Sequence, residues 1–467
     1  MHWFNFPVFG LLFLTVACAG QPVGSASADG GLQRALAYRP ECPPRLGFAT
    51  VGGSGRHLSP PQSRIIEVTT LAADGTGSLR EALRAKGPRT VVFRVGGIID
   101  FRPFESLVIN EPYLTVAGQT APEPGISLYG LELIIKADQV VLQHLRFRPG
   151  DQLDPQRPKK INDKGWTQFS ERDALKISAS DVFIDHCSFS WATDELVQVR
   201  GNRVAFYRCL FGEGLDFKGH HKGAHSKGLI VFNYDSASGD SIAIYQNLFV
   251  RNLDRNPQIS GGVSALIANN YVAHSKFGLG IVHQLVRAPG QEGGPTLSVV
   301  ENAYFGVWKN PFRYVARPAH TRGQVFLGRQ WIEGVPIDDP WALERLHLRP
   351  SDGWEGDPRN SRADAPPVSW QDFPLWPAES LRDSLLPHCG AFPKARDPLD
   401  QRLLEQAQMD KESKNKKMPA TVAQAGGWPV LAERRGDLSL PTRPLTLGPQ
   451  GYTRLEVFLQ QRCQMVE

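Results

Sequence analysis

Five short segments in the middle of the chain share one pattern of hydrophobic and polar positions. Apolar residues alternate with a period of two, a polar or small residue follows, and a second apolar pair ends the segment. The segments begin at Val140, Val182, Val204, Ile242 and Ala265. Alternation of this kind is typical of short β-strands, and not of helical repeats. Starts lie 22 residues apart from Val182 to Val204 and 23 apart from Ile242 to Ala265, which indicates stacked repeat units.

This pattern predicts an all-β fold, the coils of a parallel β-helix. Strands in each coil pair with equivalent strands in the coils above and below, about 4.8 Å away, so equivalent side chains form columns. We expect a core column of Phe147, Phe189, Phe211 and Phe249. A second column contains Leu145, Cys187, Cys209, Asn247 and Asn270, where the asparagines can form an amide ladder. The two cysteines are interpreted as small buried side chains and not as a disulfide.

Acidic residues interrupt the repeat at one place. The segment VFIDHCSFSWATDE ends in Asp194 and Glu195, whereas the equivalent VAFYRCLFG lacks both acids. A site can be built from outward side chains of neighbouring coils. Asp173 precedes Asp194 by 21 residues, about one coil, so the two should share one exterior face. If side chains alternate strictly along this strand, Gln198 points to the same side as Asp194, and Glu195 points to the opposite side.

The N-terminus predicts export. An apolar run ends in Ala17-Cys18-Ala19, a small-x-small cleavage site, and the same stretch passes as a lipoprotein box with a possible lipid anchor at Cys18. The protein is therefore expected to be secreted, periplasmic or an outer-membrane lipoprotein. No later segment is expected to span a membrane. In the remaining chain, Cys42 and Cys389 could form a clasp in an oxidising compartment.

The predicted organisation has four parts. Residues 1–20 form the signal, 21–45 a linker, 46–334 the β-helix, and 335–467 an irregular C-terminal extension packed on it. The net charge of +5 over 467 residues fits an acidic substrate only weakly and does not indicate nucleic-acid binding. We expect a monomer.

Several motifs follow one another in a familiar order. They are TVVFRVGGIID, LTVAGQTAPEPGISL, LRFRPGD, IDHCSFSWATDE, GHHKGAHSKG and DRNP. With these motifs the chain resembles bacterial pectate lyases, strongly over residues 46 to 310 and more weakly beyond 389. The resemblance implies a right-handed parallel β-helix that cleaves pectate (polygalacturonate) by calcium-dependent β-elimination.

The resemblance also implies a calcium site. Glu171 and Asp173 match the family's acid-x-acid pair, and Asp194 matches the acid one coil later. Gln198 stands where the family has a further acid, so it can offer an oxygen to calcium or substrate without a charge. Calcium takes six to eight oxygen ligands, which these side chains, water and a substrate carboxylate could supply together.

Catalytic and substrate-binding residues follow from the same resemblance. Arg255, in Arg-Asn-Pro, matches the catalytic arginine, and Ser260 stands where a second arginine is usual. Lys227 matches a lysine near the scissile sugar, with Lys222 as its rival, and Lys222 and His225 are candidates for substrate binding. Arginine is an awkward base because its pKa is above about 12, whereas lysine pKa values shift readily. Physical chemistry alone therefore favours Lys227 as the base, and the resemblance favours Arg255.

Alternatives remain for the histidines and for the function. His220, His221 and His225 could suggest zinc, but their Gly- and Lys-rich surroundings favour a turn-rich surface on the substrate side. The leading function is an exported pectate-type lyase. The changes at Gln198 and Ser260 leave a non-catalytic polysaccharide-binding β-helix as the alternative. A β-helical glycoside hydrolase ranks third, because its Asn-Thr-Asp and Gly-His-Gly patterns are absent.

Overall fold

A computed structural model of the chain describes its central and C-terminal regions. The described residues are 64–152, 160–161, 167–168, 171–217, 220, 225–233, 241–283, 294–315, 323–343, 347–348, 358–370, 375–411, 415–446 and 453–467. The predicted signal and linker, Cys18, Cys42, Lys222 and His221 lie outside them.

The first face of the molecule is one long parallel sheet. Its strands, in spatial order, are β1 (Arg64–Val68), β2 (Arg89–Phe93), β4 (Leu114–Ala117), β6 (Val140–Gln143), β11 (Val182–Asp185), β14 (Val204–Tyr207), β17 (Ser241–Tyr245), β20 (Ser264–Ala268), β23 (Thr296–Val300) and β26 (Gln324–Leu327). The repeat segments found in the sequence each contribute one strand, and partners such as Val182 and Val204 are in register.

Two further faces run alongside the first. The long strands β3 (Val95–Ile109) and β5 (Ile126–Ile135) contribute to both. The second face continues through β7 (Leu145–Arg148), β12 (Ser188–Phe189), β15 (Leu210–Gly212), β18 (Leu248–Val250), β21 (Tyr271–Ala273), β24 (Ala303–Phe305) and β27 (Gln330–Ile332). The third face contains β10 (Leu175–Ile177), β13 (Glu195–Val199), β16 (Lys227–Asn233), β19 (Gln258–Gly261), β22 (Phe277–Val282), β25 (Asn310–Val315) and β29 (His347–Leu348).

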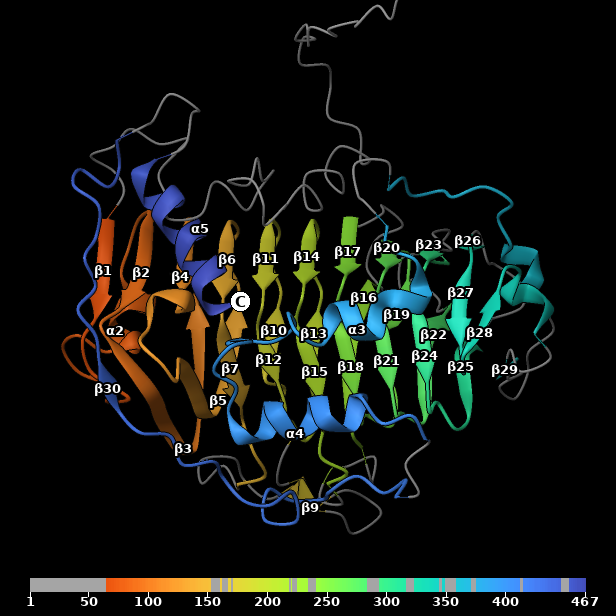
Figure 1. The fold of residues 1–467 in the computed structure, drawn as a ribbon, viewed down its shortest axis with the longest axis horizontal. Helices are drawn as coiled ribbons and strands as arrows, with labels where there is room; N and C mark the ends of the chain where they lie inside the picture. Colours follow the sequence, from red (N-terminus) through yellow and green to blue (C-terminus); the bar gives the residue numbers. More distant parts are fainter. Residues whose placement is uncertain are drawn as a thin grey trace, which may run out of the picture.

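Each coil thus supplies one strand to each face, as β11, β12 and β13 do. The predicted parallel β-helix is confirmed, and Figure 1 shows its coils stacked along the long axis. Among the described residues, three short pairings are antiparallel: β28 (Val335–Ile337) with β27, β30 (Arg434–Arg435) with β3, and β8 (Lys160–Ile161) with β9 (Thr167–Gln168). Pairing of β29 with β25 extends the third face beyond residue 334, the predicted end of the β-helix.

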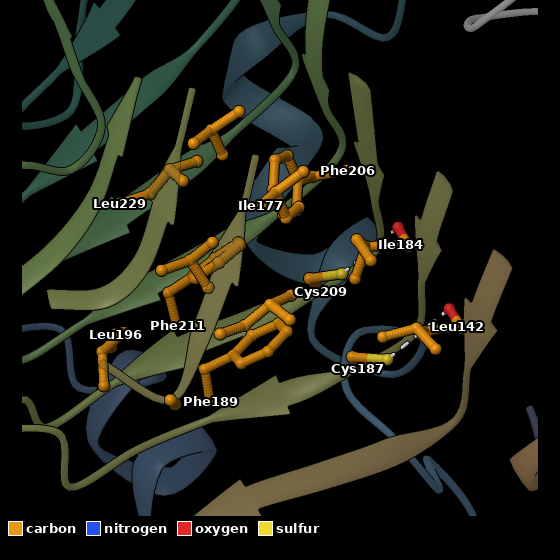
Figure 2. Packing of buried hydrophobic residues seen from close by; sticks show 14 of the residues in the cluster. Leu142, Ile177, Ile184, Cys187, Phe189, Leu196, Phe206, Cys209, Phe211 and Leu229 are labelled. Atoms are coloured by element: carbon orange, nitrogen blue, oxygen red, sulfur yellow. Dashed lines mark hydrogen bonds between the residues drawn. The ribbon is translucent and has the colours of Figure 1, made fainter. Parts of the chain in front are cut away.

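The phenylalanine column fills the core as predicted. Ring centroids lie 5.0 Å apart from Phe147 to Phe189, 5.3 Å from Phe189 to Phe211, and 4.7 Å from Phe211 to Phe249. Figure 2 shows Phe189 and Phe211 stacked in the interior, with cysteine side chains beside them. All four rings are buried. The strand register holds them one coil apart, so the core is a set of aligned columns.

The amide ladder is also confirmed, and it is longer than predicted. The side-chain amide of Asn247 donates to Asn270 at 3.0 Å, and that of Asn270 donates to Asn302 at 3.0 Å. Asn302 donates in turn to Gln330 at 3.2 Å. The ladder lies at the corner between the first and second faces. Farther along that corner, Cys187 and Cys209 are buried free thiols, as expected.

The C-terminal region packs short α-helices against the outside of the β-helix. They are α3 (Leu381–Leu385), α4 (Pro398–Ala407) and α5 (Arg454–Val466); near the N-terminal end lies α2 (Leu79–Arg84). Short 3-10 turns are η3 (Gly118–Thr120), η4 (Pro340–Ala342), η5 (Pro358–Ser361) and η6 (Ala378–Ser380). The helices α3 and α4 lie against the second face (Figure 1), where Leu381 and Leu403 share an apolar cluster with Leu248. Cys389 in this region is a buried free thiol. Among the described residues, no helix combines the length and apolar character needed to cross a bilayer.

Candidate functional site

Five of the predicted site residues gather at the corner between the second and third faces: Asp173, Asp194, His225, Lys227 and Arg255. Asp173, Asp194 and Arg255 lie just before the third-face strands β10, β13 and β19, and Lys227 is the first residue of β16. Glu195 is the register partner of Lys227, and Lys227 is the partner of Asp254. Charges of opposite sign are therefore stacked from coil to coil. The stretch of sequence between β15 and β16 is much longer than residues 190–194 in the coil before, and the structure describes residues 213–217, 220 and 225–226 of it.

Three carboxylates meet at this corner. Oxygen atoms of Asp173, Asp194 and Glu195 all lie within 4.8 Å of one another. The expected convergence of Asp173 and Asp194 is therefore seen. The expectation that Glu195 points away is wrong. β13 begins at Glu195 and Asp194 belongs to the preceding bend, so strand alternation does not apply between them. We call Asp173, Asp194 and Glu195 the carboxylate triad.

Asp173 is buried, with 1% of its surface exposed. One oxygen accepts a hydrogen bond from the backbone N–H of Glu195 at 2.9 Å, and the other lies 3.4 Å from Lys176 Nζ. The same ammonium donates to Glu132 at 2.7 Å. Burial raises the pKa of Asp173 well above its usual range; Lys176 opposes this rise, while Asp194 and Glu132 add to it. Burial and the neighbouring acids therefore favour the neutral form of Asp173, despite the nearby Lys176.

Two imidazoles face the other side of Asp194. Its Oδ1 lies 2.9 Å from His225 Nε2 and 3.5 Å from His220 Nε2. The two rings are stacked with centroids 3.9 Å apart. Burial acts to raise the pKa of Asp194, but the contacts with His220 and His225 outweigh it and hold that pKa far below its usual range. Burial lowers the pKa of His225.

These histidines do not form the surface expected from the sequence. Their exposed fractions are 0% for His220 and 5% for His225. The physical reason is that both side chains contact Asp194 of the preceding coil and are buried there. Substrate binding by His225 stays a prediction.

Arg255 and Lys227 lie on the same corner, each beside an acid. The Arg255 guanidinium forms an ion pair with Glu195, and these side chains are 18% and 5% exposed. Burial lowers the pKa of Arg255, while Asp194 and Asp173 act in the opposite direction. Lys227 Nζ donates to Asp254 at 3.2 Å. The predicted cationic pair is thus adjacent to the carboxylate triad, with both cations already engaged.

A second arginine reaches the corner from an unexpected position. Ser260 is fully buried and accepts a hydrogen bond from Gln258 at 3.0 Å, so its place in the sheet has no room for an arginine. Arg313, on β25, instead forms an ion pair with Asp254 and lies over the ring of Phe277 at 5.3 Å. It supplies a second guanidinium to the same face.

Two of the predicted calcium ligands remain apart from the triad. Glu171 is half-buried and is not a member of the carboxylate triad. Gln198 is half-buried on β13, in register with Lys176 and Ile230. Their roles stay predictions, as does that of Lys222, which lies outside the described residues.

The triad offers calcium the hard oxygen donors that it requires. Lys176 and Arg255 stand beside two of the three carboxylates and supply positive charge there. A calcium ion at this corner would share the triad with those cations, so its affinity depends on how readily they give way. The donor set fits the ion in chemistry.

Sequence reasoning missed several members of the corner: Glu132, Lys176, Asp254 and Arg313, and the place of Glu195. Glu132 and Lys176 lie on the two strands that precede β13 on the third face, and Arg313 lies three strands beyond β16. Aligning the third-face strands by their repeat spacing could have found Lys176, because Lys176 is in register with Gln198. Arg313 follows the long interval between β22 and β23, which hides its register from the sequence.

Comparison with known proteins gives a consistent resemblance. No family model matches the chain. "Probable pectate lyase C" of Aspergillus terreus is 31% identical over 219 residues, which cover 46% of this chain and 44% of that protein. "Probable pectate lyase C" of Aspergillus fumigatus is 28% identical over 439 residues, covering 88% of this chain and 91% of that protein. The match thus spans less than half of the first relative and most of the second.

A plant protein also matches, "Pectate lyase 3" of Ambrosia artemisiifolia, at 26% identity over 50% of this chain and 57% of that protein. The relatives named here are fungal and plant proteins, so the bacterial part of the predicted resemblance is not supported. Among solved structures, "Pectate lyase bound to hexasaccharide" overlaps with a TM-score of 0.47 at 13% identity, covering 74% of this chain and 94% of that one. Because this TM-score is below 0.5, the solved structure carries no argument about the fold, which the strand pairings show directly.

Proposed function

We propose that this chain is a polysaccharide lyase that cleaves pectate, or a closely related uronan, by β-elimination. The observation that carries the proposal is the corner itself. Arg255 and Lys227 lie beside three convergent carboxylates, on a β-helix similar over most of its length to a protein named probable pectate lyase. Cationic groups beside an acidic cluster suit a substrate that carries one carboxylate on every sugar.

The reaction requires removal of a proton from C5, next to the substrate carboxylate. A base takes that proton, and its electron pair forms the C4–C5 double bond. The C4–O bond breaks, and the leaving sugar oxygen keeps the bonding electrons and takes up a proton. Water is not consumed, so the products are one unsaturated and one ordinary chain end.

Arg255 is the proposed base. Its burial supports this role because burial favours the neutral guanidine over the charged form. The partnership with Glu195 must loosen before the proton is taken, and an acidic substrate competes for the same guanidinium. Lys227 is the proposed group that neutralises charge developing on the substrate, and its register with Glu195 supports this role.

Calcium is proposed at the carboxylate triad, with Glu171 and Gln198 as further oxygen donors. When bound, calcium would neutralise the substrate carboxylate and make the adjacent C5 proton more acidic. The support is the convergence of Asp173, Asp194 and Glu195, whose oxygen atoms lie within 4.8 Å of one another.

One observation favours a second function, non-catalytic binding of an acidic polysaccharide. Arg255 and Lys227 both have acidic partners, and a protein that only binds needs no unprotonated arginine. The same cations would then pair with uronate groups along the chain. Export, with or without a lipid anchor at Cys18, accompanies either function and rests on the N-terminal sequence. The monomer stays a prediction.

The test is an ultraviolet assay for the unsaturated product, run on polygalacturonate, its methyl ester and other uronans, with and without chelator. A lyase makes absorbing product, a hydrolase makes only reducing ends, and a binding protein makes neither. Loss of activity on chelation and recovery with calcium would support the metal. Absence of product on every uronan, with retained binding to one of them, would replace the lyase proposal by the binding function.

A further inference from the structure

The second cluster at Asp194 differs in chemistry from the carboxylate triad. It consists of two imidazole nitrogens and one carboxylate oxygen, from His220, His225 and Asp194. The two histidines lie near the end of the long turn between β15 and β16, whereas Asp194 comes from the coil before. Only the fold brings them together. Their ligand atoms all lie within 4.8 Å of one another.

The contact of His225 with Asp194 is not an ordinary hydrogen bond. The atoms are only 2.9 Å apart. Even so, within the described part of the chain, neither His225 Nε2 nor Asp194 Oδ1 makes a hydrogen bond of acceptable geometry. Both groups are largely buried, where an atom poorly matched to its neighbour is costly. A cation held between the two groups would give both atoms a bonding partner.

The spacing of the ligand atoms suits a transition metal. Bonds of about 2.0–2.1 Å from zinc to nitrogen and oxygen place tetrahedral ligands about 3.3 Å apart. The two separations from Asp194 Oδ1 are 2.9 and 3.5 Å, which lie on either side of that value. The two imidazole rings are stacked with centroids 3.9 Å apart, and the Nε2 atoms of both lie within 3.5 Å of the same carboxylate oxygen.

We propose that His220, His225 and Asp194 bind a divalent ion of the zinc class. Two imidazoles and one carboxylate favour zinc, cobalt or nickel over calcium and magnesium, which prefer sites made of oxygen alone. Three protein ligands leave a fourth position for water or another small ligand. This site does not depend on lyase activity. It shares Asp194 with the carboxylate triad, so the two sites draw on one side chain.

The test is calorimetric titration of the full-length, metal-stripped protein with zinc alone and, separately, with calcium. We expect one tightly bound zinc ion. His220→Ala and His225→Ala should each weaken zinc binding by more than the 10- to 100-fold typical of residues that only support a ligand. Because His220 is fully buried, His225→Gln provides a milder variant, and circular dichroism checks that each variant is folded.

Two controls separate this site from others. His388→Ala removes a half-buried histidine of the C-terminal region and should leave zinc affinity unchanged. Asp173→Asn removes one member of the carboxylate triad and should leave zinc affinity within a few-fold. Cobalt in place of zinc should give a spectrum of nitrogen and oxygen ligands that changes in His225→Gln. Equal zinc affinity in the wild type and the folded double variant His220→Ala/His225→Ala would overturn the proposal, whatever the lyase assay shows.

Discussion

Replacing Glu195 by glutamine tests whether Arg255 is the base. Glu195→Gln keeps the size of the side chain and removes the charge that faces the Arg255 guanidinium. Both side chains are mostly buried, at 5% and 18% exposed, so solvent screens the pair only in part. The carboxylate favours the protonated guanidinium. Its removal must therefore lower the pKa of Arg255.

The size of the effect follows from the electrostatics of a close pair. Two unit charges about 4 Å apart attract by about 4 kcal/mol at an effective dielectric constant of about 20. One pKa unit corresponds to about 1.4 kcal/mol, so the upper limit is about three units. Allowing for partial exposure of Arg255, we expect a decrease of about one to three units. If neutral Arg255 takes the C5 proton, the alkaline rise in activity should move to lower pH by that amount.

The assay is kcat/KM for release of unsaturated product, measured across pH for the wild type and Glu195→Gln. Glu301→Gln is the matched control, because Glu301 pairs with Arg329 at 3.0 Å, at the corner between the first and second faces. Its profile should not move. Leaving the Arg255 charge buried without its partner should also cost about 3–5 kcal/mol of folding free energy, seen as a lower Tm. A profile that stays in place, or moves to higher pH, would exclude Arg255 as the base.

Four further changes have defined outcomes. Arg255→Lys keeps the charge but loses the planar fork, so steady-state kinetics should show kcat reduced about 100-fold with KM nearly unchanged; full turnover would rule out the role. Burial raises the pKa of Asp173 in the folded protein. The native state therefore loses stability as pH rises above about 3.9, the pKa of aspartate in the unfolded chain. The Tm of Asp173→Asn minus that of the wild type should therefore increase as pH rises from about 4 to 8; a Tm difference that stays constant would contradict this. Phe211→Ala opens a gap between stacked rings and should cost about 3–5 kcal/mol in urea unfolding; a loss under about 1 kcal/mol would mean that the column is not a tightly packed core. Gln198→Asp should tighten calcium binding in calorimetry; unchanged affinity would place Gln198 outside the calcium shell.

The repeat could be read from the sequence because a β-helix is built by translation. When strands pair in register, residues about 22 positions apart occupy the same place in successive coils. Phe189 and Phe211 stack for that reason, and Asn247 and Asn270 form a ladder for the same reason. The convergence of Asp173 and Asp194 was accessible by this rule alone.

The partners of each charge were not accessible in this way. Glu195 was expected to point away, yet it faces Arg255, because the bend before β13 breaks the alternation on which that expectation rested. Arg313 lies beyond the long interval between β22 and β23 that obscures its register, and it reaches Asp254 through the length of its side chain. Coil spacing identifies neighbours along the stack. It does not say how far a long side chain extends or toward which neighbour.

The sequence by itself therefore determined the β-helix, its aromatic and amide columns, and the coils that carry the acids, since these depend on short periods and local pairing. Only the tertiary structure decided that His220 and His225 contact Asp194, that Lys176 lies between Glu132 and Asp173, and that Arg255 faces Glu195. The physical reason is that a turn between coils has no period of its own. Its path, and so the charge or ligand set that it presents, is set by packing against the coils on either side.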